Sequence, residues 1–178
     1  MTPILNINHI LIRALQIDDL DAFAQYRNCE SIARYQSWEN YTLEDAQKLL
    51  QSTDYSTFGK AGNWYQLAVT DSQSEQLLGD LAVHFIDDQQ VEIGFTISPE
   101  HQGLGIAFQS VRQLLSYLFL ERNTHRVIAI TDADNLASRQ LLTKLGFRKE
   151  AHFVKNILFK GKWGDECLFA MLQDEYTG

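Results

Sequence analysis

One segment in the middle of the chain constrains the fold more than any other. In residues 91–97, apolar side chains alternate with polar or small ones, which is the period of a strand. Pro99 ends this strand, because a strand interior cannot use a residue that lacks an N–H. Apolar residues then recur at helical spacing from 107 to 118, and the continuous apolar run 127–130 predicts a strand covered on both faces. The segment is therefore predicted to form a strand-helix-strand crossover.

The rest of the chain predicts a mixed fold whose other strands are mostly antiparallel. Further strands are expected at 9–15, 64–70, 76–86, 147–159 and 163–172, and further helices after Asp18, after Thr42 and from 135 to 145. Thr42 and Asp45 resemble a capping box, and Gly146 is a suitable residue to end the last helix. No repeat or linker divides the chain. We therefore expect one α/β (α+β mixed) domain over residues 1–178, built on a central twisted sheet of about seven strands.

The charge and the cysteine content exclude several classes of protein. The 178 residues carry 15 Lys plus Arg against 23 Asp plus Glu, a formal charge of −8, with no basic block to bind nucleic-acid phosphates. Cys29 and Cys167 lie far apart without the spacing of a zinc site, so neither a metal site nor a disulfide framework is expected. No apolar stretch approaches the roughly 18 to 20 residues of a membrane span, and the N-terminus lacks the pattern of a secretion signal. We expect a cytoplasmic protein that binds neither membranes nor nucleic acid directly.

The loop from Pro99 to Ala107 has the features of an anion site. Gly103 and Gly105 let the backbone approach a ligand closely, and the helix that follows begins with N–H groups that have no acceptor within the helix. The helix dipole adds to the attraction, so a pyrophosphate is a natural ligand. The pattern is neither a P-loop nor a full dinucleotide fingerprint, since Phe108 occupies the position of the third glycine.

Two motifs resemble those of the GNAT N-acetyltransferase superfamily. Gln102 to Ala107 fits its Gln-x-x-Gly-x-Ala loop for the pyrophosphate of coenzyme A, and Asn135, Ser138 and residues 145–147 resemble its Asn-x-x-Ser...Leu-Gly-Phe motif. The resemblance extends over nearly the whole chain. It is closest to the RimJ/RimL-type branch, which acetylates N-terminal amino groups of ribosomal proteins and also includes enzymes acting on other amines. The residues that match this branch are 35–38, 92–95, 125–127 and 163–165.

The resemblance implies acetyl-CoA as the cofactor, bound where the strand around Glu92 splays from the strand around Val127. Backbone groups of Phe95, Thr96 and Ile97 would pair with the pantetheine arm. The pyrophosphate would be held by Gln102, Gly103, Leu104, Gly105, Ile106 and Ala107, with Asn135 and Ser138 near the arm and Lys144 near the phosphate end.

The same resemblance implies direct transfer of the acetyl group to an amine. Glu92 is the first candidate for the base that deprotonates the amine, directly or through water, and His84 is the second. Whether these two side chains share a face depends on the register set by the turn between their strands. Many superfamily members carry a Tyr where this chain has Leu142, so Ser138 is the candidate proton donor to the departing thiolate. Neither cysteine has a neighbour that would activate it, so no covalent enzyme intermediate is expected.

The acceptor is expected to be a primary amine, first of all the N-terminus of a protein or peptide. Its pocket is expected to include Tyr35 to Trp38, His84 and aromatic residues of the last hairpin such as Phe153 or Trp163. The negative total charge is compatible with a basic acceptor. A small-molecule amine such as a polyamine, antibiotic or metabolite is an alternative acceptor, and a non-catalytic acyl-CoA-binding module is an alternative function. The chain is expected to be a monomer or a homodimer.

Overall fold

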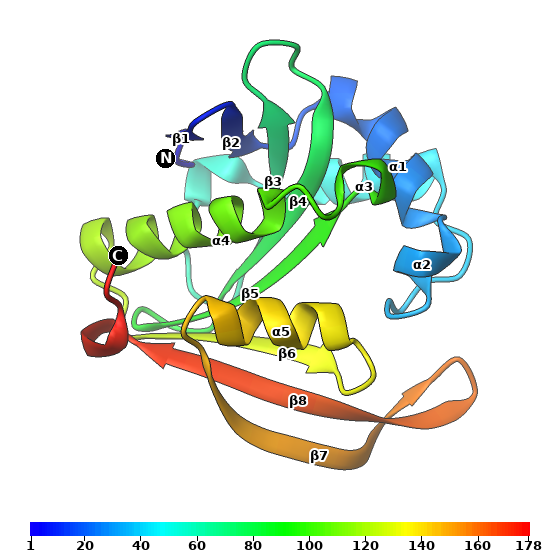
Figure 1. The fold of residues 1–178 in the computed structure, drawn as a ribbon. Coiled ribbons are helices and arrows are strands. Elements are labelled where there is room, and N and C mark those ends of the chain that lie inside the picture. The colour runs from blue at the N-terminus through cyan, green and yellow to red at the C-terminus, as the bar shows by residue number, and fades with distance from the viewer.

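One twisted sheet of eight strands, in the order β1-β2-β3-β4-β5-β6-β8-β7, runs through the computed structural model, which describes residues 1–178 (Figure 1). The strands are β1 (Leu5–Ile7), β2 (Ile10–Ala14), β3 (Trp64–Asp71), β4 (Leu77–Phe85), β5 (Gln90–Ile97), β6 (Arg126–Asp132), β7 (Arg148–Phe159) and β8 (Lys162–Leu172). All neighbouring strands pair antiparallel except β5 and β6, which are parallel. The mixed fold and its strand-helix-strand crossover are thereby confirmed.

The helices lie on both sides of this sheet. They are α1 (Leu20–Arg27), α2 (Glu30–Ala33), α3 (Leu43–Ser52), α4 (Ile106–Ser116), which continues into a π-helical turn at Tyr117–Glu121, and α5 (Leu136–Lys144). The expected capping box begins α3: the Asp45 N–H donates to Thr42 Oγ1 (3.1 Å), and the Thr42 N–H donates to Asp45 Oδ2 (2.8 Å). No helix has both the length and the apolar character needed to cross a membrane.

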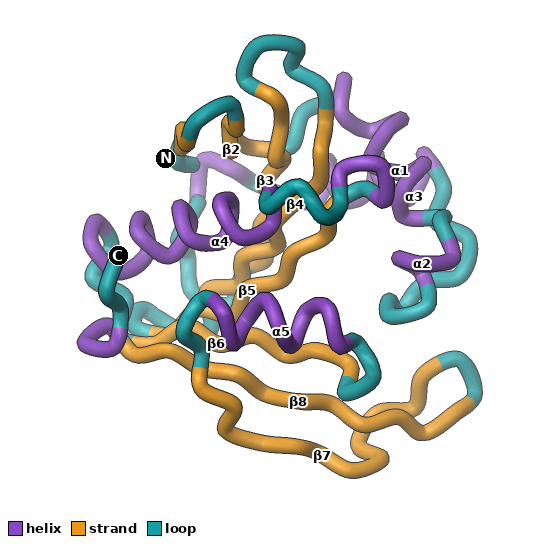
Figure 2. The backbone as a smooth tube through the Cα atoms, in the orientation of Figure 1, coloured by secondary structure: helices purple, strands orange, loops and turns teal.

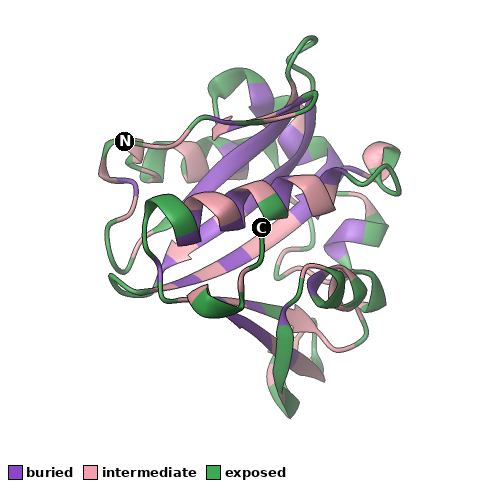
Figure 3. Ribbon diagram, turned by 60° about the vertical axis from the view of Figure 1, so that its left-hand side comes forward, coloured by how far each residue is buried: buried purple, intermediate pink, exposed green.

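Two apolar cores hold these layers together. The larger core lies between α4 and one face of the central strands, where Leu114 belongs to the same buried cluster as Leu81 and Ile93. The smaller core lies on the other face, where α1 and α3 cover β3, and it includes Phe23 and Ala68. Figure 2 shows α4 crossing one side of the sheet, and Figure 3 shows that burial is concentrated in the central strands.

β5 and β6 pair only at their beginnings. Residues 90–92 of β5 are in register with residues 126–128 of β6, and the pairing stops there. β5 nevertheless pairs with β4 as far as Ile97, and β6 pairs with β8 as far as Asp132. The two strands therefore diverge in mid-sheet, which leaves an opening between them.

Two features of the strands differ from the sequence prediction. β1 is an additional strand with only three residues, too few for an alternating pattern to be detected, and its pairing with β2 defines it. The prediction that the strand at 127–130 is covered on both faces is wrong, because Ile130 is 39% exposed. Its side chain faces the opening between the diverging strands rather than a covering helix.

Candidate active site

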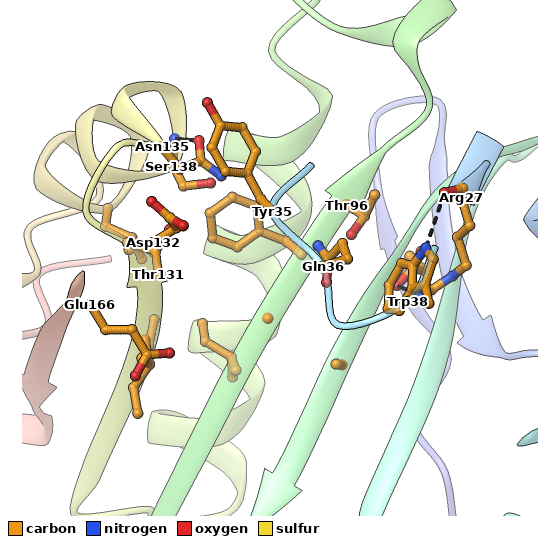
Figure 4. A pocket seen from close by; sticks show the side chains of 18 of the residues that line it. Arg27, Tyr35, Gln36, Trp38, Thr96, Thr131, Asp132, Asn135, Ser138 and Glu166 are labelled. Carbon is orange, nitrogen blue, oxygen red and sulfur yellow. Dashed lines mark hydrogen bonds and ion pairs between the residues drawn. The ribbon is translucent and has the colours of Figure 1, made fainter. Parts of the chain in front are cut away.

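Two adjoining cavities occupy the opening between β5 and β6. The large cavity, of about 820 Å³, lies against the loop before α4 and the start of α5. The small cavity, of about 300 Å³, reaches from β3, β4 and β5 across to β8 (Figure 4). Both linings include Tyr35, Gln36, Phe95, Thr96, Asn135 and Ser138. These six residues form a junction, so groups bound in the two cavities meet there.

The loop before α4 presents a row of free backbone donors to the large cavity. None of the N–H groups from Gly103 to Phe108 donates to an acceptor within the protein. Gly103 and Gly105 adopt left-handed backbone conformations, with φ of 76° and 78°. Gln102 Nε2 donates to the Ile97 carbonyl oxygen (2.9 Å), which ties the loop to the end of β5. Free donors at the N-terminus of an eleven-residue helix fit a pyrophosphate group.

The predicted cofactor residues surround this cavity with one exception. The lining includes Phe95, Thr96, Ile97, Gln102, Gly103, Gly105, Ile106, Ala107, Asn135, Ser138 and Lys144. Leu104 does not line it, and this residue is 65% exposed. Arg34 also lines the cavity and adds a cation to that of Lys144. Arg34 was not predicted, because it comes from a distant segment after α2 and belongs to no local motif.

Asn135 and Ser138 stand together at the N-terminus of α5. Asn135 Oδ1 accepts a hydrogen bond from the Ser138 N–H (3.1 Å), so the asparagine caps the helix. The Ser138 hydroxyl has no protein partner and lies at the junction of the two cavities. Leu142, one turn further along α5, lines the small cavity with hydrocarbon and is 1% exposed. Ser138 is therefore the hydroxyl that α5 offers to the junction.

The walls of the small cavity come from three separate parts of the chain. Ala82 of β4 and Gly94 of β5 are in register, and their small size leaves a hollow above the sheet. Tyr35, Gln36 and Trp38 line one side, and Trp38 Nε1 donates to the Arg27 carbonyl oxygen (3.0 Å). Ile157, Phe159 and Glu166 of the β7–β8 hairpin line the far side.

The charges that line the two cavities are opposite in sign. The small cavity has one cation and three carboxylates: Arg27, Asp80, Asp132 and Glu166. In the large cavity two cations face one carboxylate: Arg34, Lys144 and Asp134. This polarity fits a ligand with anionic groups in the large cavity and a cationic group in the small one.

Asp132 and Glu166 are direct cross-strand partners on β6 and β8. Asp132 Oδ1 accepts from the Asp134 N–H (2.7 Å), and Glu166 Oε2 accepts from Asn156 Nδ2 (2.5 Å). Both carboxylates face the small cavity in Figure 4. Like charges directly opposite each other are destabilising in a sheet, so a cation placed between them would be stabilised.

Asp80 is held at the back of the small cavity by three donors. It accepts hydrogen bonds from the Tyr26 hydroxyl, the Gln66 side-chain amide and Arg27 Nη2 (3.0 Å). Burial raises the pKa of Asp80, and the charge of Arg27 offsets part of that rise. Asp80 and His84 lie on the same face of β4, four residues apart, but no local pattern in the sequence indicates the three donors.

The register answers the question that the sequence left open about His84 and Glu92. They are direct partners on β4 and β5, with His84 Nδ1 3.6 Å from Glu92 Oε2, and the histidine ring stacks on Trp64 with centroids 4.5 Å apart. The two side chains therefore share a face, although neither lines the cavities. Phe153 and Trp163 also lie outside both cavities and are 40% and 59% exposed.

Known proteins resemble this chain over most of its length. The family model described as an acetyltransferase (GNAT) domain matches residues 9–148. The uncharacterized N-acetyltransferase YnaD of Bacillus subtilis (strain 168) is 28% identical over 169 residues, which cover 94% of this chain and 96% of that protein. The ribosomal protein uS5-alanine N-acetyltransferase of Escherichia coli (strain K12) is 25% identical over 123 residues, which cover 67% of this chain and 63% of that protein.

Solved structures share the fold. An acetyltransferase of the GNAT family from Bacillus anthracis superposes with a TM-score of 0.85 at 25% identity, covering 97% of this chain and 99% of that one. The spermidine N-acetyltransferase from Vibrio cholerae, in complex with CoA and spermine, superposes with a TM-score of 0.82 at 24% identity, covering 94% and 98%.

Proposed function

We propose that this chain, which belongs to the GNAT acetyltransferase family, transfers an acetyl group from acetyl-CoA to a primary amine held in the small cavity. The chain is an acyltransferase that uses acetyl-CoA. Residues 1–178 act as one domain in this proposal, because β8 lies beyond the matched residues 9–148 and contributes Glu166 to the small cavity. The observation that carries the proposal is the junction of a donor-rich cavity with a carboxylate-lined one.

The large cavity is proposed to hold the coenzyme. The free N–H groups of Gly103 and of residues 105–108 would donate to the pyrophosphate, and Arg34 and Lys144 would attract its charge. The β6-facing edge of β5 has no strand partner beyond Glu92, so its backbone groups are free to pair with the amides of an extended arm. When bound, acetyl-CoA supplies the acetyl group as an activated thioester.

Ser138 is proposed as the proton donor to the leaving group. Its hydroxyl lies at the junction and has no protein partner that would compete for its proton. Leu142 cannot serve, since its side chain carries no proton to donate. Backbone N–H groups of the free β5 edge near Phe95 or Ile97 would polarise the carbonyl oxygen.

Glu92 is proposed as the base that deprotonates the acceptor amine through water. It lies two residues before Gly94, which lines the small cavity, and on the same strand face. His84 Nδ1 lies 3.6 Å from Glu92 Oε2, and stacking of the ring on Trp64 holds the histidine beside the carboxylate. Glu92 does not line either cavity, so a water molecule would carry the proton from the amine to its carboxylate.

We propose the N-terminus of a protein or peptide as the first acceptor class, as in the RimJ/RimL-type branch. The relationship to the E. coli uS5-alanine enzyme supports this choice. An α-amino group titrates near 7.7–8.0, against about 10.4 for an alkylamine such as Lys, so a carboxylate deprotonates it more easily at neutral pH.

A polyamine is the second candidate acceptor. The observation that favours it is that Asp132 and Glu166 lie opposite each other on β6 and β8 and both line the small cavity. Their two carboxylates would hold the second ammonium group of a polyamine. The structural neighbour from Vibrio cholerae, crystallised with CoA and spermine, belongs to this class.

The test measures CoA release with peptides that begin with Ala, Ser or Met, with the same peptides N-acetylated, and with spermidine. Turnover with the free peptides alone supports an N-terminal acceptor, and turnover with spermidine alone supports the polyamine. Glu92→Gln and Ser138→Ala should each lower kcat while the Kd for acetyl-CoA, from calorimetry, stays near that of the wild type. If the rate of acceptor-dependent CoA release is the same in both variants as in the wild type, the roles of Glu92 and Ser138 are overturned. If the wild type does not bind acetyl-CoA, the proposed cofactor site is overturned.

A further inference from the structure

We propose that Gln66 binds the acceptor amine through its side-chain oxygen and selects nitrogen nucleophiles for the reaction. The inference rests on the proposed function, because it needs the amine to occupy the small cavity.

Gln66 lies at the end of the row of residues that forms the cavity floor. It is the register partner of Ala82 on β4, which is in turn the partner of Gly94 on β5, so the three residues cross the sheet side by side on one face. A Cβ added to Gly94 would meet only the Ala82 Cβ, at 3.6 Å, which shows how little fills the floor there. In this row only Gln66 carries a side chain long enough to offer a polar group to a ligand above the floor.

The side-chain amide of Gln66 is held in one orientation. Its Nε2 donates to the Asp80 carboxylate, which also accepts hydrogen bonds from Tyr26 and Arg27. Because the carboxylate is an acceptor, the NH₂ group of Gln66 must face it. The amide oxygen must then point away from Asp80. The Tyr26 and Arg27 contacts fix the carboxylate in turn, so the oxygen is part of a rigid network rather than a mobile side chain.

The oxygen of this amide is open to the cavity. Gln66 Oε1 receives no hydrogen bond from the protein, and it retains some accessible surface. The side-chain atoms that are both fully buried and without a hydrogen-bond partner are Arg27 Nε, His84 Nδ1, Ser110 Oγ and Arg139 Nε. The residue as a whole is only 8% exposed, and it lines the small cavity. The remaining accessible surface of its oxygen therefore faces the cavity.

An amide oxygen suits a nucleophile that must lose a proton. It accepts an N–H from the ammonium form and equally from the neutral amine, and it takes no proton itself. One N–H held by Gln66 directs the nitrogen while the base removes another proton and frees the lone pair. An alcohol has a single O–H, so it cannot both donate to Gln66 and give its proton to the base.

The experiment compares Gln66→Met, which keeps the length of the side chain and removes its polar atoms, with Gln90→Met. Gln90 is a matched control because its Nε2 also donates to an aspartate, Asp87 (2.9 Å), but outside both cavities. Gln66→Met is expected to lower kcat/KM for the amine about ten- to a hundredfold, with the larger part in KM, while the Kd for acetyl-CoA stays within about twofold. Gln90→Met should change neither.

Two outcomes separate failure of this inference from failure of the proposed function. If the wild type acetylates an amine and Gln66→Met has the same kcat/KM, the role of Gln66 is overturned and the proposed function stands. If the wild type binds acetyl-CoA and acetylates no amine, both are overturned.

A measurement on the wild type covers the case in which Gln66→Met does not fold. The side-chain amide resonance of Gln66, assigned in labelled protein with CoA bound, should shift when the acceptor amine is added. The Gln90 resonance should stay in place. A Gln66 resonance that does not move at a saturating amine concentration would overturn the contact.

Discussion

Removal of the Arg27 guanidinium tests the buried charge network behind the small cavity. Arg27 Nη2 lies 3.0 Å from Asp80 Oδ2, and the two side chains are only 7% and 2% exposed. The guanidinium also stacks 4.0 Å above the Phe23 ring and 4.5 Å from Trp38. Met at position 27 keeps much of this apolar packing and deletes the charge, so Arg27→Met isolates the electrostatic part.

The expected loss is large because Asp80 would be left buried without its cation. Breaking a buried ion pair by removing one partner costs about 3–5 kcal/mol. At about 2–4 °C per kcal/mol for a chain of this size, the midpoint of thermal unfolding should fall by roughly 6–20 °C. Arg27→Met/Asp80→Asn leaves no unpaired charge, so it should lose less than the sum of the two single variants, by about 1–3 kcal/mol.

The loss should also depend on pH. Burial raises the pKa of Asp80 above its ordinary value of 3.8, and the Arg27 charge opposes that rise. Without Arg27 the folded-state pKa is higher still. The stability contributed by Asp80 is then fully present below pH 3.8 and is lost as the pH rises through the folded-state pKa, so Arg27→Met should be less destabilised at pH 4 than at pH 7.

Urea unfolding followed by circular dichroism at both pH values provides the measurement. Lys48→Met is the control, because it removes one cation from an exposed pair with Glu44 (2.8 Å) and should leave the midpoint essentially unchanged. An Arg27→Met variant as stable as Lys48→Met, or single-variant losses that add within about 0.5 kcal/mol, would refute the reasoning.

Three further predictions concern the loop, a helix cap and an acidic pair. Gly105→Ala and Gly62→Ala should each lower the free energy of unfolding by on the order of 1 kcal/mol, because both backbones are left-handed (φ 78° and 81°). Only Gly105→Ala should weaken acetyl-CoA binding in calorimetry, and equal affinities of the two variants would contradict the loop assignment. Thr42→Ala removes the cap of α3 and should lower the free energy of unfolding by about 1 kcal/mol in urea titrations, with kcat unaltered; an unchanged midpoint would count against the cap. Hydrogen bonds from two arginines lower the pKa of Glu150 from 4.5 to about 2, so the stability that it contributes is present above pH 4.5 and is lost as the pH falls toward 2. The free energy of unfolding of Glu150→Gln should therefore fall less steeply than that of the wild type between pH 5 and about 2, and identical pH profiles would disprove this.

Much of the site was predictable from the sequence because its parts depend on neighbours within one turn. Asn135 and Ser138 lie at the start of α5 and the glycine loop lies before α4, where the local patterns indicated, and outside the site the Thr42 capping box begins α3 as expected. Each such feature is a hydrogen bond or a backbone conformation set by a few successive residues. The change from strand to helix periodicity likewise located the crossover around the glycine loop before α4.

Only the tertiary structure decided which distant side chains meet. His84 faces Glu92, Asp132 faces Glu166 and Gln66 reaches Asp80, because the strands pair in one register, and a slip of one residue would turn each side chain to the other face. The divergence of β5 from β6 after Glu92 has no local signature either. The sequence by itself therefore determined the fold class, the glycine loop before α4 and the Thr42 capping box, whereas strand pairing across long separations in the chain determined the carboxylates and the amide that line the small cavity.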